Sequence, residues 1–172
     1  HSWRGLLPLL AEHFTVIAPD LPGHGFTGGA LPGRPELGAM AAGIAGLLEA
    51  LDLSPALIAG HSAGAGIALE LVRRGPAVPV VGFSPALLPF PGPAAKLFPA
   101  MARLLVLNPV VPRLFSGIVR LPGESARFLR RSTASPIDAA GEACYARLFA
   151  SPRHCEGALA MMAAWDLEGL AA

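Results

Sequence analysis

One five-residue motif carries the side chains best suited to chemistry. The run Gly60-His61-Ser62-Ala63-Gly64 has the pattern Gly-x-Ser-x-Gly, which is typical of a sharp turn between a strand and a helix. Such a turn lifts a serine hydroxyl above the sheet and needs small residues around it. We therefore predict that Ser62 is a nucleophile. The backbone N–H of Ala63, at the start of the next helix, would donate to a developing oxyanion.

The residues on either side of this motif support the prediction. The apolar run 56–59 predicts a buried strand that ends at the motif. The segment 63–74 predicts an apolar helix that begins there and stops before Gly75-Pro76. An ordinary glycine-rich turn between a strand and a helix is the alternative interpretation.

A second motif follows an earlier apolar segment. The run from Asp20 to Thr27 contains Gly23, His24 and Gly25, and such glycine-rich runs form turns. Taken alone, it predicts only a turn in which Asp20 and Thr27 tie the loop down. Paired with the motif around Ser62, it becomes a specific signal. We do not predict a catalytic role for His24.

The first half of the chain alternates helices and strands. Expected, in order, are a short helix over 3–10, a buried strand over 14–18, a loop over 19–35, a helix over 37–51, a strand over 56–59, a helix over 63–74 and a strand over 78–83. This alternation predicts the α/β class, with a parallel sheet covered by helices on both faces.

The second half has a different pattern. A proline-rich connector covers 85–93, and several helices separated by prolines follow from 94 to about 165. We predict three parts: a core over 1–85, an inserted helical lid over 86–166, and the start of a return to the core over 167–172. The lid is basic between residues 96 and 131, where Glu124 is the one acid against Lys96, Arg103, Arg113, Arg120, Arg127, Arg130 and Arg131.

The two motifs together resemble the α/β-hydrolase family, in which Asp-x-x-Gly-His-Gly-x-Ser/Thr follows the strand two before the nucleophile. That resemblance implies an α/β-hydrolase fold, with the Asp20–Thr27 loop mainly structural. Within this fold the chain looks most like the magnesium-chelatase accessory proteins of bacteriochlorophyll biosynthesis. The segments that carry this narrower likeness are Leu87–Phe90, Leu107–Phe115 and Ala158–Leu167.

The resemblance implies a triad whose acid and base follow the serine in that order. Asp138 and His154 come later than Ser62, but both lie in helical lid sequence, so we reject them as its partners. We expect the acid and base beyond Ala172, and the first oxyanion loop before His1. The chain then resembles an internal fragment that lacks the first and last strands, and we expect it to be unstable alone.

Composition excludes several other classes of protein. The net charge of +1 does not favour nucleic-acid binding. The longest uncharged stretch, 75–95, holds six prolines and cannot form a spanning helix. The start of the chain shows no signal peptide, and Cys144 and Cys155 have no metal or redox spacing, so we expect reduced thiols in a cytoplasmic protein. No metal ligand cluster, dinucleotide fingerprint or phosphate loop is visible, and we predict no cofactor.

Two functions fit these observations. The first is an esterase-like serine hydrolase with a small apolar or acyl substrate. A serine at the elbow argues against dehalogenase and epoxide hydrolase chemistry, for which the resemblance calls for Asp. The alternative is a non-catalytic accessory protein that binds a tetrapyrrole or a magnesium-chelatase subunit. Its basic lid would suit ring carboxylates or an anionic membrane surface, unless this lid is merely a solvated face.

Overall fold

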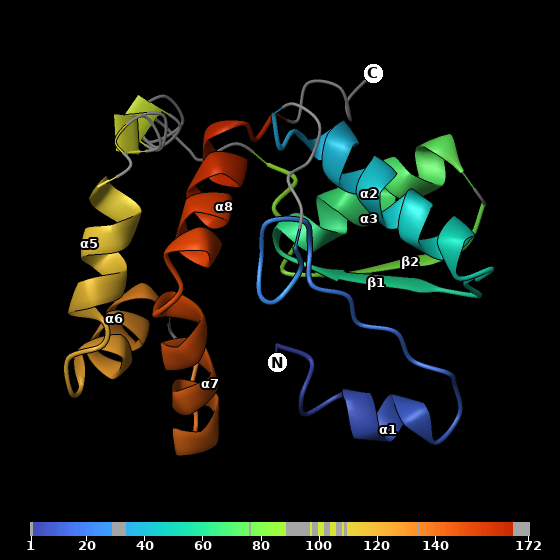
Figure 1. Ribbon diagram of the computed structural model, residues 1–172. Coiled ribbons are helices and arrows are strands. Elements are labelled where there is room, and N and C mark those ends of the chain that lie inside the picture. Colours follow the sequence, from blue (N-terminus) through green and yellow to red (C-terminus); the bar gives the residue numbers. More distant parts are fainter. Residues whose placement is uncertain are drawn as a thin grey trace.

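The computed structural model (Figure 1) describes residues 2–28, 34–75, 77–88, 97, 100–101, 104–105, 108, 110–133 and 135–166. Its elements are α1 (Leu7–Ala11), α2 (Leu37–Ala50), β1 (Ile58–His61), α3 (Ala63–Arg74), β2 (Val80–Phe83), α5 (Val110–Ile118), α6 (Glu124–Ser132), α7 (Ala139–Phe149) and α8 (Pro152–Ala163). The α/β half (α2, β1, α3 and β2) and the helical half (α5 to α8) lie side by side in Figure 1. Within the helical half, α8 is the helix next to the α/β half.

The two strands form a parallel pair, as predicted. Ile58 lies opposite Val80, and His61 lies opposite Phe83. Helix α3 connects them and packs against both strands. Parallel strands need such a crossover. The predicted strand, helix and strand are confirmed, although β1 begins and ends two residues later than the predicted strand over 56–59. This arrangement places the end of β1 and the start of α3 at one edge of the pair.

The core lies between α2 and α3. The apolar stripe of α2 packs on α3, as the helical spacing predicts. The buried cluster consists of Leu37, Met40, Ala41, Ile67 and Leu71. On this side the strands are covered by α3, with α2 packed on it (Figure 1).

The other face of the strands is less covered than predicted. Helix α1 lies on that side (Figure 1), and the ring of Trp3 contacts the ring of Phe83 at a centroid distance of 5.7 Å. Phe83 nevertheless stays 43% exposed, and Val81 stays 40% exposed. Helices therefore flank the strands as predicted, but the cover on this side leaves Val81 and Phe83 partly exposed.

The predicted strand over 14–18 is also wrong. This segment is extended, but β1 and β2 are the only strands that pair among the described residues. Phe14 and Ile17 remain exposed. A strand is stabilised by a neighbour that supplies hydrogen bonds and cross-strand packing. β-Branched composition alone does not replace that neighbour.

The second half is helical where it is described, as predicted. Helix α5 packs on α8, and α7 packs on both α6 and α8. Asp138 begins α7 by accepting a hydrogen bond from the Gly141 N–H at 2.7 Å, and Ser151 caps α8 with Pro152 in its first turn. The predicted connector 85–93 is described only to residue 88, and the predicted return over 167–172 lies outside the described residues.

Neither cysteine forms a disulfide. Cys155 is buried and Cys144 is half-buried. Burial raises the pKa of the Cys155 thiol, which keeps it protonated. In the described part of the chain, none of the helices has the length and apolar character needed to cross a membrane.

Candidate functional site

Ser62 stands at a strained turn between β1 and α3. Its backbone has φ 54° and ψ −120°, a combination that a residue with a side chain rarely adopts. The Ser62 N–H donates to the Phe83 carbonyl at 3.0 Å, and its carbonyl accepts from the Ala86 N–H at 3.1 Å. Bonds to β2 and to the loop after it thus hold the turn. The side chain of Ser62 is exposed.

The glycine before the serine has no space for a side chain. A Cβ built on Gly60 would lie 2.5 Å from both the backbone N and the Cα of Ala65. The first turn of α3 therefore approaches β1 at a distance that only glycine permits. A Cβ on Gly64 would meet no neighbouring heavy atom within 4 Å, so the expectation of tight packing on both sides of Ser62 holds for Gly60 alone.

Ala63 is the first residue of α3. The N–H groups of a first helical turn have no acceptor inside the helix, and the helix dipole is positive at that end. The Ala63 N–H is therefore available beside the serine, and its environment favours a negative charge there. His61 is exposed at the end of β1.

The loop 20–27 closes on itself. The Asp20 carboxylate accepts from the Phe26 N–H at 3.0 Å, and the Thr27 hydroxyl donates to the Asp20 carbonyl at 2.7 Å. Gly25 has φ 53°, and a Cβ there would lie 2.6 Å from Oδ1 of Asp20. The structure therefore contains the contacts expected if Asp20 and Thr27 hold the loop in place.

Sequence reasoning missed what this loop touches. The Gly25 N–H donates to Nδ1 of His154 on α8 at 3.0 Å. The rings of His24 and His154 meet edge to face, with centroids 5.7 Å apart. Burial lowers the pKa of His154, and His24 adds to that effect, while Asp20 opposes it. The partners lie more than a hundred residues apart, so no local pattern could have paired them.

Asp138 and His154, which the sequence excluded as partners of Ser62, both have other contacts. Asp138 caps α7 and accepts from the Arg4 guanidinium at 2.6 Å. The hydrogen bond from Arg4 and the backbone bond from Gly141 hold the pKa of Asp138 below its usual value. His154 is engaged with the loop 20–27. These contacts account for both residues without a role beside Ser62.

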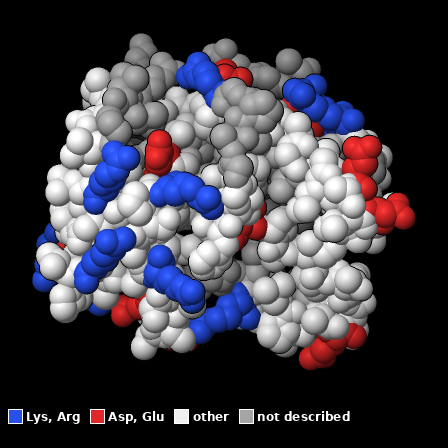
Figure 2. All heavy atoms as spheres, in the orientation of Figure 1, with Lys and Arg blue, Asp and Glu red and all other residues white. Residues whose placement is uncertain are grey.

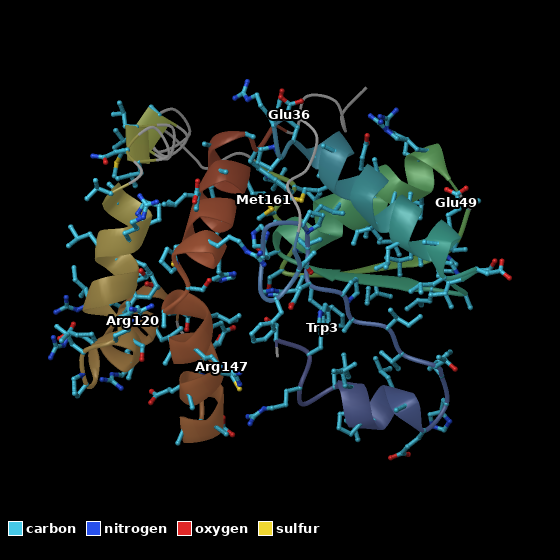
Figure 3. All side chains as sticks on the ribbon, in the orientation of Figure 1. Trp3, Glu36, Glu49, Arg120, Arg147 and Met161 are labelled. Carbon is cyan, nitrogen blue, oxygen red and sulfur yellow. The ribbon has the colours of Figure 1, made fainter. Side chains whose placement is uncertain are left out.

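The far end of α8 reaches the start of α3. Met161 packs against the α2–α3 core (Figure 3), and Trp165 packs against the same core. A Cβ on Gly66, in the second turn of α3, would lie 3.1 Å from the indole of Trp165. Helix α8 therefore runs from the loop 20–27 to the first turns of the helix that follows Ser62.

A cavity of about 320 Å³ lies at the C-terminal end of α3, away from Ser62. It is bounded by α2, by the loop after α2 and by the last turns of α3. Its lining includes Leu48, Leu71 and the carboxyl-bearing Glu70. Glu70 is buried and paired with Arg73 at 2.9 Å and Arg74 at 2.5 Å, and the hydrogen bond from Arg73 lowers its pKa. This polar cluster anchors the end of α3 opposite Ser62. Within the described ranges, no three His, Cys, Asp or Glu side chains gather as metal ligands would.

Basic side chains gather over the helical half of the molecule (Figure 2). Those of α5, α6 and the turn between them are exposed: Arg113, Arg120, Arg127, Arg130 and Arg131. Arg120 donates to the Ala150 carbonyl at 2.7 Å, and Arg127 pairs with Glu124. Lys96 and Arg103, which complete the predicted basic set, lie outside the described residues.

Comparison with known proteins agrees with this geometry. A magnesium-chelatase 30 kDa subunit of Rhodobacter capsulatus is 41% identical over 169 residues, which are 97% of this chain and 58% of that protein. A 2-hydroxy-6-oxo-2,4-heptadienoate hydrolase of Pseudomonas putida is 36% identical over 80 residues, covering 44% of this chain and 27% of that protein. The chain thus spans less than two thirds of the length of either relative.

Two solved structures are similar over nearly the whole chain. The ligand-free epoxide hydrolase CorEH has a TM-score of 0.75 at 27% identity, with 98% of this chain and 64% of that chain covered. Wild-type Cfl2 from Burkholderia cenocepacia has a TM-score of 0.71 at 27% identity, and the match covers 95% of this chain and 58% of that chain. A model of the alpha/beta hydrolase family matches residues 1–171. The chain belongs to the alpha/beta hydrolase family.

Proposed function

We propose that the protein containing this chain is a serine hydrolase of carboxylic esters or related acyl compounds, with Ser62 as its nucleophile. The observation that carries the proposal is the backbone of Ser62, which holds a positive φ between β1 and α3. Such strain persists where the surrounding structure maintains it, and it concentrates at functional sites. The exposed hydroxyl and the N-terminus of α3 lie at the same turn.

The reaction follows from these groups. The Ser62 oxygen attacks the carbonyl carbon of the substrate, and its proton passes to a base. The carbonyl oxygen becomes an oxyanion, which the Ala63 N–H stabilises. Collapse of this intermediate expels the leaving group with a proton, and water then hydrolyses the acyl-serine. We expect the base and its acid partner in residues beyond Ala172.

The similarity to an epoxide hydrolase is a similarity of fold. That reaction in this fold calls for a carboxylate at the elbow, as the family resemblance implies, and this chain has Ser62 there. A hydroxyl nucleophile supports acyl transfer.

Replacement of Ser62 by Ala in the complete protein tests the proposal. Hydrolysis of p-nitrophenyl butyrate should fall by at least about a thousandfold, because the nucleophile is lost. The unfolding midpoint in urea should change little. Labelling of the wild type by a fluorophosphonate should disappear in the variant, whereas Ser54→Ala, in the loop between α2 and β1, should leave both signals unchanged. Hydrolysis at the wild-type rate by Ser62→Ala would refute the proposal.

A second function is favoured by a different observation, the arginine-rich face of α5 and α6. Guanidinium groups bind carboxylates through paired hydrogen bonds, and the relative from R. capsulatus is a magnesium-chelatase subunit. An accessory protein that binds a tetrapyrrole or a chelatase subunit would need no turnover. The same face would attract an anionic membrane surface. A cytoplasmic location fits either function.

Reversal of two charges separates this function from the first. Arg130 and Arg131 are both exposed, and Arg130 forms an ion pair with Glu142 at 3.4 Å. The double variant Arg130→Glu, Arg131→Glu should weaken binding of protoporphyrin IX and of anionic vesicles by about tenfold or more. Arg34→Glu, at the start of α2, is the matched control. Unchanged binding of both ligands would remove this face from the function.

A further inference from the structure

The contact between the loop 20–27 and α8 joins the two halves of the chain. The Gly25 N–H donates to Nδ1 of His154 at 3.0 Å. The ring of His154 meets that of His24 at an interplanar angle of 82°. Next to it, the Arg153 guanidinium donates to the Thr27 carbonyl at 2.5 Å. Three contacts, made by His24, Gly25 and Thr27, thus hold the first turn of α8 on the loop.

Two glycines allow this close approach. A Cβ built on Gly157 would lie 2.8 Å from the carbonyl carbon of Gly23. A Cβ on Gly23 would lie 3.6 Å from the Gly157 Cα, and Gly23 itself has φ 75°. The backbones of loop and helix therefore touch where a side chain on Gly157 would separate them.

The bond from Gly25 requires an unprotonated Nδ1 on His154. An imidazolium carries a proton on both ring nitrogens, so a protonated His154 would point a donor at the Gly25 N–H. His154 also lies in the first turn of α8, with its N–H on the Ser151 hydroxyl. A helix N-terminus disfavours a positive charge.

The other charged and titratable groups at this contact come from the loop and from α8. The His24 ring faces His154, with its Nδ1 3.0 Å from the Pro22 carbonyl. Its buried Nε2 has no hydrogen-bond partner among the described residues. Asp20 favours a charged His154, whereas burial and His24 lower the pKa of His154 and outweigh it. Arg153 adds a second positive charge on the same helix.

The same helix leads to a contact with α3, the helix that follows Ser62. Trp165, directly after α8, lies against Gly66 in α3, and Met161 packs on the α2–α3 core. A shift of the first turn of α8 away from the loop therefore moves groups beside the helix that follows Ser62.

We propose that the loop 20–27 and α8 form a histidine joint, docked while His154 is neutral and released when His154 gains a proton, and that its release moves Trp165 against α3 and so alters hydrolysis at Ser62. The second part rests on the proposed function, whereas the docking itself does not. The direction with pH follows from the lowered pKa. Docking is complete above the ordinary pKa of 6.5 and weakens as the pH falls below that value.

Amide hydrogen exchange in the complete protein carrying Ser62→Ala tests the docking without any contribution from activity. Protection of the Gly25 amide, corrected for intrinsic exchange, should fall between about pH 8 and about pH 5. The fall should be up to about tenfold for each unit by which the pKa of His154 in the docked state lies below its pKa in the released state. The variant His154→Gln should keep protection at low pH, because an amide oxygen accepts from Gly25 at any pH. The control His13→Gln, at an exposed position, should behave like the parent.

Two outcomes would overturn the joint. One is a Gly25 protection that does not change with pH in the parent, and the other is a pH dependence that persists in His154→Gln. The variant Gly157→Leu supplies a second measurement, since it should remove protection of Gly25 at every pH while α2 and α3 stay protected. Full protection of Gly25 in Gly157→Leu would contradict the docked geometry.

A final comparison separates this inference from the proposed function. If protection of the Gly25 amide changes with pH as expected but hydrolysis by the wild type does not depend on Ser62, the joint stands and the hydrolase proposal fails. If hydrolysis depends on Ser62 and protection of the Gly25 amide does not change with pH, the joint alone fails. If both hold, His154→Gln should shift the acidic limb of the rate profile in the protein that retains Ser62.

Discussion

Gly60 and Gly64 flank Ser62 symmetrically in the sequence, but their surroundings differ. A Cβ at Gly60 would collide with the backbone of Ala65, whereas one at Gly64 would find open space. Backbone atoms in a strand–helix turn cannot move aside without breaking the bonds that hold Ser62 to β2. Only the first glycine is therefore required by packing.

Alanine substitutions at these two positions should give opposite results. Gly60→Ala should lower the free energy of unfolding by at least about 2 kcal/mol, because the turn must open to admit the methyl group. Gly64→Ala should change it by less than about 1 kcal/mol, and in the stabilising direction, because alanine favours the helix. Urea unfolding of the complete protein measures both. Equal losses from the two changes would show that this turn is not packed as described.

At the scale of elements, the helical half has its own core of aromatic rings. Phe115 of α5 lies 5.1 Å from Phe128 of α6 and 5.9 Å from Phe149 of α7, measured between ring centroids. Tyr145 stacks on Phe149 at 5.7 Å. Such pairs stabilise beyond the area they bury. Three helices therefore meet at Phe149, which lies at the end of α7.

Truncation of this ring should loosen the helical half alone. Phe149→Ala should cost about 2–4 kcal/mol, since it removes three ring contacts from a half-buried site. Hydrogen exchange should become faster in α5, α6 and α7 and stay slow in α2 and α3. Phe14→Ala, which removes an exposed ring, is the control and should change neither. Faster exchange throughout the chain after Phe149→Ala would show that the two halves unfold as one unit.

At the scale of the whole molecule, apolar side chains remain uncovered around the strand pair. Leu57, Val81 and Phe83 are between 40% and 47% exposed, and Phe14 and Ile17 are exposed on the nearby extended segment. Contiguous exposed apolar surface promotes association, as does an unpaired strand edge. The chain also spans only 58% of the relative that matches it over most of its length.

The 172 residues expressed alone should therefore bind the dye ANS and aggregate, as the sequence analysis also predicts. The complete protein should do neither under the same conditions. Size-exclusion chromatography and dye fluorescence measure the difference. A monomeric 172-residue chain with a cooperative urea transition would contradict this expectation and would show that the exposed face is tolerated.

Much of the fold and the elbow could be predicted from local patterns in the sequence. The spacing of Leu37, Met40 and Ile44 determines a helix by itself, because an apolar stripe has one stable arrangement on a core. The motif around Ser62 determines its turn, since Gly60 is compatible with that close approach and larger residues are not.

Only the tertiary structure decided what depends on a distant neighbour. The segment 14–18 has a strand-like sequence, but it forms no strand because no described strand pairs with it. The contact of His154 with His24 and Gly25 joins residues about 130 positions apart, and no periodicity reports such a pair. Local steric preferences belong to the sequence, whereas pairing and burial exist only after the chain brings separate segments together.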